Sequence, residues 1–170
     1  MTENLVLLGA TGSIGTQALD VAEKLDIRVS AMAAGSRVEP FEPLCRKFKP
    51  QAVAMMDEAA AKDLRVRLAD TDIRVLSGLS GVCELAATPD ADTVLNSVTG
   101  VAGLQPTLAA IEAGHDVALA NKKRSWPAAN SSPKRWRKKV SNCFPLTAST
   151  PRFSNVCREN PETAAPLACC

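Results

Sequence analysis

The chain has 170 residues, of which 46% are hydrophobic, and its formal net charge is +2. This length allows one well-packed domain and leaves little room for a second. No apolar run approaches the roughly 18 residues of a membrane span, and the start Met1-Thr2-Glu3-Asn4 lacks the basic segment of a secretory signal, so we expect a cytoplasmic protein with no membrane partner.

Six apolar stretches alternate with segments of helical periodicity over the first 121 residues. The expected strands cover 4–8, 27–34, 52–56, 73–76, 93–98 and 117–120. The expected helices lie between them, over 14–25, 41–48, 59–68, 81–87 and 104–113. This alternation predicts βαβ units with right-handed crossovers, and therefore an α/β fold with a doubly wound, six-stranded parallel sheet of the Rossmann-like type.

Charge divides the chain near residue 122. Residues 1–121 carry 10 Lys and Arg against 16 Asp and Glu, a net of −6, whereas residues 122–170 carry 10 against only Glu159 and Glu162, a net of +8. The second part shows no apolar period and is rich in Pro and Cys. We therefore expect a folded domain over 1–122, followed by a basic tail over 123–170 that is irregular or disordered.

The first expected strand runs into a glycine-rich loop, Gly9-Ala10-Thr11-Gly12-Ser13-Ile14-Gly15, which leads into the first helix. Gly9 permits a tight turn, Gly12 leaves room for a pyrophosphate, and Gly15 lets the helix pack on the strand. The N–H groups of Thr11 to Ile14 lie at the positive end of a helix, where an anion binds. The spacing and its context predict a dinucleotide-binding loop.

The residues after the second expected strand distinguish between the two nicotinamide dinucleotides. An NAD site usually has an acidic residue there, about 20 residues after the glycines, which bonds the ribose hydroxyls. This chain has Ala33-Ala34-Gly35-Ser36-Arg37, which offers a hydroxyl and a guanidinium in place of a carboxylate. Because those donors suit a 2′-phosphate, the sequence favours NADPH; the alternative is that Arg37 is only a solvated surface charge.

From about Asn4 to Lys122 the chain resembles the 1-deoxy-D-xylulose 5-phosphate reductoisomerase family, NADPH enzymes of isoprenoid precursor synthesis by the methylerythritol phosphate route. The resemblance rests on the glycine-rich loop, on Gly35-Ser36-Arg37, and above all on the block that begins Asn96-Ser97-Val98-Thr99-Gly100 and ends Ala120-Asn121-Lys122. It implies an oxidoreductase with a small phosphosugar substrate.

The resemblance also assigns site residues. It implies that Thr11, Gly12, Ser13 and Ile14 contact the pyrophosphate of NADPH, and that Gly35, Ser36 and Arg37 contact the adenosine phosphate. Asn121 would help to hold the nicotinamide half, and Lys122 would meet the substrate.

The family pattern is broken after Lys122. Family members continue Asn-Lys-Glu, and that Glu contacts NADPH, whereas this chain has Lys123. Farther on, the family has a strand bearing Pro-Val-Asp-Ser-Glu-His-Ser, whose carboxylates bind Mg²⁺ or Mn²⁺. This sequence lacks that motif. We therefore assign no catalytic residue and no metal ligand, and we expect the chain to be inactive as written and not to form the homodimer of its family.

A reading frame displaced by one base accounts for the break. In the displaced frame, each codon after Lys122 consists of the third base of one present codon and the first two bases of the next. The residues that this permits include the family's continuation, Asn-Lys-Glu-Thr-Leu-Val-Ala. Its Ala is the only residue that Trp126-Pro127 permits, because Trp has a single codon. From Cys143 to Cys157 the same shift permits Leu-Pro-Val-Asp-Ser-Glu-His-Ser-Ala-Ile-Phe-Gln-Cys-Leu. Our hypothesis is the loss of one base near the Lys122 codon, in the gene or in its sequencing. The alternative is a genuine tail that binds nucleic acid through the basic segment 134–139.

Overall fold

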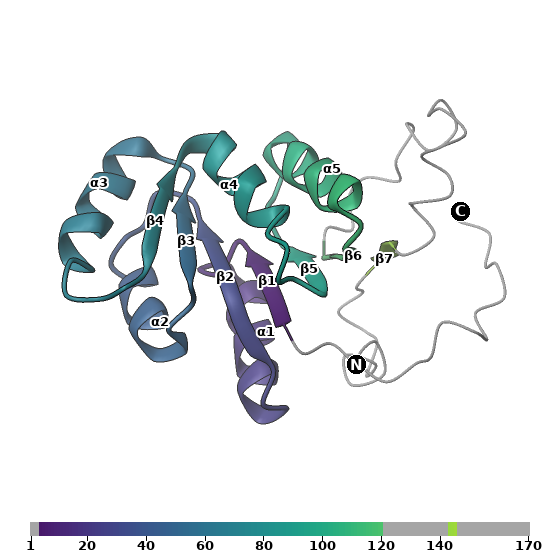
Figure 1. The fold of residues 1–170 in the computed structure, drawn as a ribbon, viewed down its shortest axis with the longest axis horizontal. Coiled ribbons are helices and arrows are strands. Elements are labelled where there is room, and N and C mark those ends of the chain that lie inside the picture. The colour runs from purple at the N-terminus through teal and green to yellow at the C-terminus, as the bar shows by residue number, and fades with distance from the viewer. Residues whose placement is uncertain (1–3, 121–142, 146–170) are drawn as a thin grey trace, which may run out of the picture.

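The structure, a computed structural model, describes residues 4–120 and 143–145. One parallel sheet runs through it in the strand order β4-β3-β2-β1-β5-β6-β7 (Figure 1). The strands are β1 (Asn4–Leu8), β2 (Arg28–Ala34), β3 (Ala52–Met55), β4 (Arg74–Ser77), β5 (Thr93–Asn96), β6 (Asp116–Leu119) and β7 (Cys143–Pro145). The helices are α1 (Ser13–Lys24), α2 (Phe41–Phe48), α3 (Glu58–Arg67), α4 (Gly78–Ala86) and α5 (Leu104–Ala113), and a short 3-10 helix, η1 (Val101–Gly103), precedes α5.

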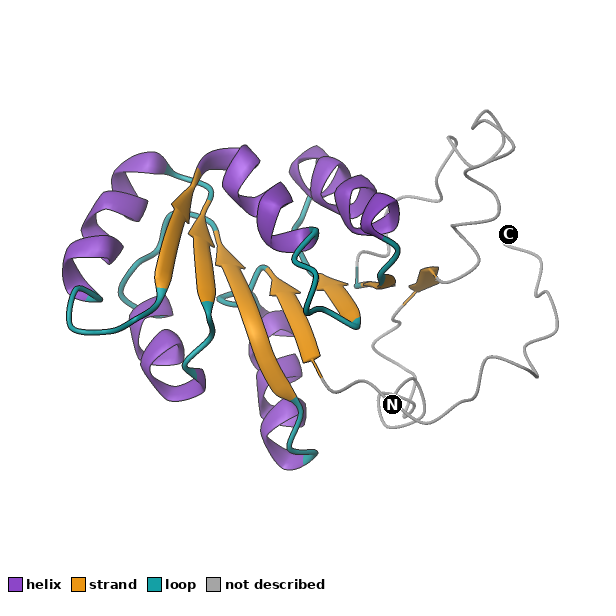
Figure 2. Ribbon diagram, in the orientation of Figure 1, coloured by secondary structure: helices purple, strands orange, loops and turns teal. Residues whose placement is uncertain are grey.

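The sheet is covered on both faces, as Figure 2 shows. Alternate residues of β1 point to opposite faces, so Leu5 and Leu7 join one core cluster whereas Val6 and Leu8 join the other. The first cluster contains buried residues of α1, α2 and α3, and the second contains those of α4 and α5. Each face of β1 is therefore buried, which explains why the strand reads as an unbroken apolar run.

The strand order reverses beside β1. The chain builds β2, β3 and β4 outward on one side, and then returns to place β5 on the other side of β1. Such a reversal leaves a crevice at the carboxyl ends of the two strands, where ligands of open α/β sheets bind.

The six-stranded parallel sheet predicted from the sequence is confirmed, and each predicted helix is present. Two boundaries differ by more than one residue. The strand β5 ends at Asn96 rather than at residue 98. The helix α4 begins at Gly78 rather than at residue 81, and Gly78 has a φ of +71° where the chain turns directly from β4 into the helix.

The tail departs from our expectation at one point. Cys143–Pro145 forms a seventh strand parallel to β6, with Val117 opposite Cys143 and Leu119 opposite Pro145. Strand pairing uses backbone groups, so a short segment can pair without the apolar alternation that we looked for. The remaining tail residues, 123–142 and 146–170, lie outside the described part, and the expectation of an irregular tail stays a prediction for them.

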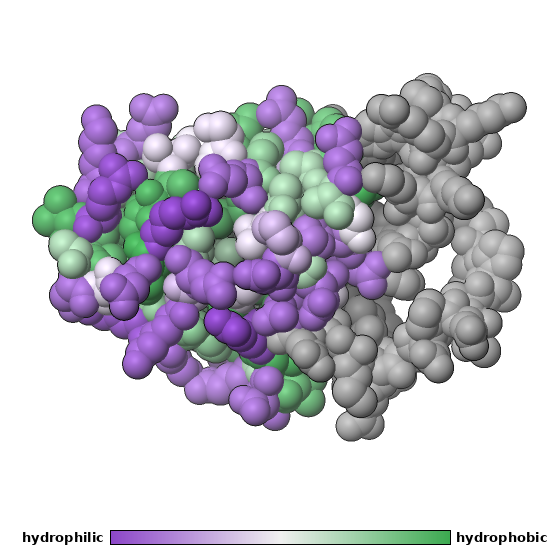
Figure 3. Space-filling model, viewed as in Figure 1, coloured by the Kyte–Doolittle hydropathy of each residue, from purple (hydrophilic) through white to green (hydrophobic). Residues whose placement is uncertain are grey.

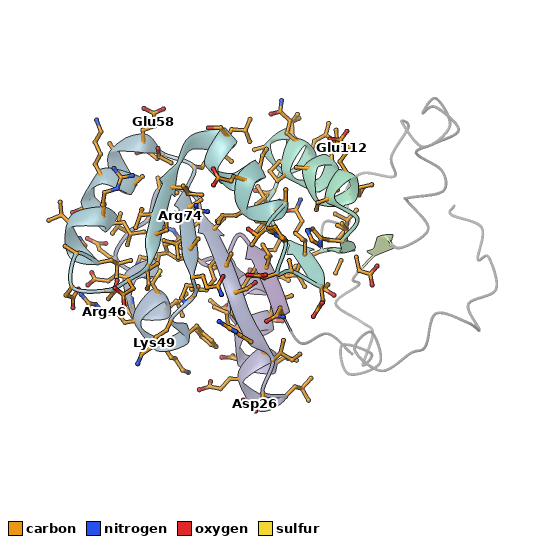
Figure 4. All side chains as sticks on the ribbon, viewed as in Figure 1. Asp26, Arg46, Lys49, Glu58, Arg74 and Glu112 are labelled. Carbon is orange, nitrogen blue, oxygen red and sulfur yellow. The ribbon has the colours of Figure 1, made fainter. Side chains whose placement is uncertain are left out.

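The other edge of the sheet is β4. Arg65 of α3 reaches over this strand and donates a hydrogen bond to the Val75 carbonyl at 2.9 Å. Ion pairs tie the neighbouring elements together: Arg46 of α2 binds Asp70 at 2.8 Å, where α2 approaches the loop that follows α3 (Figure 4). Exposed pairs of this kind each contribute little to stability.

Polar side chains dominate the face of the described part that Figure 3 presents, and its apolar patches are separated from one another. Among residues 4–120, the helices are too short or too polar to cross a bilayer.

Candidate dinucleotide-binding site

The glycine-rich loop lies at the reversal of the strand order. It follows Leu8, which is opposite Ala33 of β2 on one side and opposite Asn96 of β5 on the other. Because all three strands are parallel, their carboxyl ends meet at the edge where the loop begins. The predicted loop therefore stands where this class of fold binds its ligands.

Gly9 makes the turn out of β1. Its φ is +91°, a left-handed conformation that side chains other than hydrogen rarely adopt. The N–H groups of Gly9 and Ala10 both donate to the Ala33 carbonyl, at 2.8 and 2.9 Å, and the Gly12 N–H donates to the Gly9 carbonyl at 3.0 Å. The loop is thus held to β2 at its start and closed on itself at Gly12.

The start of α1 is open toward solvent. The helix begins after Gly12, and no described side chain caps it there. Gly15 lies against the loop so closely that a Cβ would overlap the Gly9 carbonyl oxygen and stand 2.8 Å from Ala10 Cα. The first N–H groups of a helix have no partner within it, so those of Ser13, Ile14 and Gly15 can bind an anion.

The residues after β2 face the same loop. Gly35, Ser36 and Arg37 are exposed, and the Arg37 guanidinium donates a hydrogen bond to the Thr11 carbonyl at 3.1 Å. The two groups of predicted cofactor contacts, Thr11–Ile14 and Gly35–Arg37, therefore come together. This contact leaves other Arg37 donors available, since a guanidinium carries five N–H groups.

A carboxylate does stand nearby, at the end of the neighbouring strand. The Asp57 N–H donates to the Gly35 carbonyl at 3.3 Å. Its carboxylate accepts the Ala60 N–H at 2.8 Å and so caps α3. Asp57 therefore has a structural partner at the helix, and the end of β2 itself presents Ser36 and Arg37.

Two polar residues at the carboxyl end of β5 have no role in the sequence interpretation, and one of them, Ser97, contacts the start of the loop. The Ser97 hydroxyl lies 2.7 Å from the Leu8 carbonyl and 3.1 Å from the Gly9 carbonyl. Asn96 is buried, and its amide donates to the Gly103 carbonyl at 2.8 Å and to Thr107 Oγ1 at 2.7 Å. The signal in the sequence is a polar pair at the carboxyl end of an apolar strand.

Asn121 and Lys122 lie just outside the described residues. The preceding residue, Ala120, donates its N–H to the Asn96 carbonyl at 3.0 Å, so the chain leaves the described part at the same edge of the sheet as the loop. Their assignments to the nicotinamide and to the substrate stay predictions.

The described residues do not fit a metal centre. Within residues 4–120, no three His, Cys, Asp or Glu side chains group as metal ligands would. The Cys45 thiol is buried in α2, and burial raises its pKa to about 12, so it stays protonated at neutral pH. We therefore derive no step through a metal from this part of the chain.

Known proteins share both the sequence and the fold. A family model for 1-deoxy-D-xylulose 5-phosphate reductoisomerase matches residues 5–124. The chain is 45% identical over 122 residues to that reductoisomerase from Desulfitobacterium hafniense, covering 71% of this chain and 32% of the relative. It is 51% identical over 120 residues to the chloroplastic reductoisomerase of Oryza sativa subsp. japonica, covering 68% and 25%.

Solved structures agree with these relatives. The reductoisomerase from Zymomonas mobilis in complex with NADPH superposes with a TM-score of 0.74 at 30% identity, covering 86% of this chain and 39% of that one. A reductoisomerase in complex with magnesium gives a TM-score of 0.78 at 32% identity, covering 86% and 38%. This chain spans about a third of the length of the curated relatives. The sequence match and the shared fold together establish that the chain belongs to the 1-deoxy-D-xylulose 5-phosphate reductoisomerase family.

Proposed function

We propose that residues 1–122 bind NADPH as the cofactor-binding part of a reductoisomerase, and that the chain as written does not complete the reaction. The observation that carries this proposal is the contact between Arg37 and Thr11, which joins the glycine-rich loop to the end of β2 at one edge of the sheet. The relative from Zymomonas mobilis was solved in complex with NADPH, which supports the choice of cofactor.

The described residues suit the two phosphate groups of the adenosine half of NADPH, which are the pyrophosphate and the 2′-phosphate. The uncapped N–H groups at the start of α1 would bind the pyrophosphate, and Gly12 leaves them accessible. Ser36 and the free donors of Arg37 would bind the 2′-phosphate, which NADH lacks. When bound, NADPH supplies a hydride, and the chain's role is to hold and orient it.

We expect no turnover because the residues that would hold the substrate's metal ion are missing from the sequence. The family converts 1-deoxy-D-xylulose 5-phosphate to 2-C-methyl-D-erythritol 4-phosphate, and a divalent metal held by carboxylates organises the substrate oxygens. No such carboxylate group exists in the described residues, and the sequence lacks the Asp-Ser-Glu motif. Without that Lewis acid, the transition state loses several kcal/mol of stabilisation, which is orders of magnitude in rate.

One observation supports the displaced reading frame. The strand β7 is Cys143–Pro145, and the shifted frame reads this segment as the start of Leu-Pro-Val-Asp-Ser-Glu. A family strand would thus be expected where β7 pairs with β6.

The test combines binding with turnover on the purified 170-residue chain. We expect NADPH to bind more tightly than NADH, and we expect no oxidation of NADPH when 1-deoxy-D-xylulose 5-phosphate and Mg²⁺ are added. Turnover at the rate of an ordinary enzyme would refute both the inactivity and our view of what the site requires. Equal affinity for the two cofactors would count against the assignment of Ser36 and Arg37.

The origin of the tail has a separate test. Sequencing the DNA across codons 120–125 should reveal a missing base, and insertion of one base at the Lys122 codon should restore Glu after Lys122 and the downstream motif. An intact frame, together with salt-sensitive binding of the tail to nucleic acid, would instead favour the nucleic-acid-binding alternative.

A further inference from the structure

We infer that Ser97 is a positioning residue for cofactor binding: directly after β5, it holds the Leu8 and Gly9 carbonyls, and through them the turn whose N–H groups receive the pyrophosphate. This inference rests on the proposed binding of a dinucleotide. It assigns to Ser97 a role in affinity, although the residue itself need not touch the cofactor.

The contacts of Ser97 converge on the last residue of β1 and the first of the loop. Its backbone N–H donates to the Leu8 carbonyl at 2.9 Å, and its hydroxyl lies 2.7 Å from the same oxygen. The hydroxyl is also 3.1 Å from the Gly9 carbonyl oxygen. A hydroxyl has one proton, so these two carbonyls share a single donor, and the shorter distance favours Leu8.

The Gly9 carbonyl connects the Ser97 contacts to the start of α1. The Gly12 N–H donates to it at 3.0 Å, and this bond closes the turn that leads into α1. Gly15, in the first turn of α1, lies directly against the same oxygen, because a Cβ there would overlap it. A rotation of the Gly9 peptide would therefore change both the turn and the seating of the helix start.

Hydrogen bonds of the neighbouring Asn96 hold the backbone beside Ser97. The preceding side chain, Asn96, is buried and accepts the Val98 N–H at 2.9 Å while it donates to Gly103 and Thr107. These bonds fix the backbone on both sides of Ser97. The fit is also tight, since a Cβ on Gly9 would stand only 2.6 Å from the Ser97 hydroxyl oxygen.

The chain offers a matched control in Ser30. This buried serine of β2 also donates its hydroxyl to a carbonyl of β1, that of Leu5, at 3.3 Å. Leu5 lies toward the opposite end of the strand from the loop. Replacing either serine by alanine removes one hydroxyl bond to β1, but only Ser97→Ala removes it at the cofactor edge.

The experiment measures the dissociation constants of NADPH and NADH for the full chain and for the Ser97→Ala and Ser30→Ala variants. We expect Ser97→Ala to weaken both cofactors by the same factor, about three- to tenfold, because both share the pyrophosphate. Ser30→Ala should leave both constants unchanged. The inference is overturned if Ser97→Ala changes neither constant, if it weakens NADPH alone, or if Ser30→Ala weakens binding equally.

A second measurement needs no ligand and separates this inference from the proposed function. In the ligand-free chain, Ser97→Ala should shift the amide resonances of Gly9–Gly12 and speed their hydrogen exchange, whereas Ser30→Ala should not. If the unmutated chain binds neither cofactor, the proposed function fails, and this comparison still decides whether Ser97 positions the loop. Unaltered loop amides in Ser97→Ala would overturn the inference.

Discussion

Replacement of Arg37 by alanine is the most direct test of how the site selects its cofactor. The side chain is exposed and follows β2, and its bond to the Thr11 carbonyl orients it toward the glycine-rich loop. In the variant, the 2′-phosphate of NADPH loses a charged hydrogen-bond donor. NADH has no such phosphate, so it loses only the support that Arg37 gives to Thr11.

The expected magnitude follows from these two contacts. A hydrogen bond between a guanidinium and a phosphate contributes about 1–3 kcal/mol, so NADPH should bind about 5- to 150-fold more weakly to Arg37→Ala. The bond from Arg37 to Thr11 is exposed and neutral at its acceptor, and its loss should weaken NADH by only about twofold. The preference for NADPH should therefore shrink sharply.

Isothermal titration calorimetry of both cofactors against both proteins gives the required ratio. Arg28→Ala is the matched control, because Arg28 is an exposed arginine at the opposite end of the same strand. It removes the same charge far from the loop. The reasoning is refuted if Arg37→Ala weakens NADPH and NADH equally, or if Arg28→Ala reduces the preference for NADPH as much as Arg37→Ala does.

Three further predictions concern stability. Gly15→Ala should lower the free energy of unfolding by about 1–3 kcal/mol in denaturant titration, because its Cβ would overlap the loop backbone, whereas Gly35→Ala, which meets nothing within 4 Å, should have little effect. Asp57→Ala should cost about 1 kcal/mol, since α3 loses its cap, and Asp57→Asn should retain most of that stability. Cys45 has a pKa raised by burial from 9.0 to about 12, so between these values the unfolded thiol releases its proton while the folded one keeps it. The free energy of unfolding should therefore fall as pH rises above about 9, by up to ~1 kcal/mol per pH unit, and this part of the decline should be missing in Cys45→Ala.

Each of these has a contrary outcome. Equal stability of the two glycine variants would mean that the loop relaxes away from the helix at no cost. An Asp57→Asn variant as unstable as Asp57→Ala would show that charge, rather than capping, stabilises α3. Parallel pH profiles for the unmutated chain and Cys45→Ala would indicate that the thiol reaches solvent before it ionises.

The sequence predicted the sheet and the loop because both depend on local patterns. The apolar run of β1 and the glycines at 9, 12 and 15 can each be recognised from a few neighbouring residues. The role of Ser97 could not be predicted in this way, since it exists only because β5 pairs with β1 across 88 positions of sequence. The expected strand 93–98 ends at Asn96 for a different reason: the Asn96 side chain donates to Gly103 and Thr107, and a loop starts there.

Backbone pairing also explains the unexpected β7. No side-chain period marks Cys143–Pro145 as a strand, because the feature that matters is a partner edge on β6. Sequence patterns report which face of an element is buried, and they say little about which edges of a sheet remain available.

The hydrogen bond from Arg65 to Val75 bears on how the molecule behaves at high concentration. An edge strand with free carbonyls offers a template on which a strand of another molecule can pair, and the short β4 forms such an edge. The guanidinium engages one of those carbonyls and also places a charge beside the strand, where an incoming chain would have to displace it. The Arg65 side chain thereby opposes self-association through β4. Arg65→Ala should make the purified chain aggregate more readily, as measured by light scattering, and should leave the glycine-rich loop and Gly35–Arg37 unchanged.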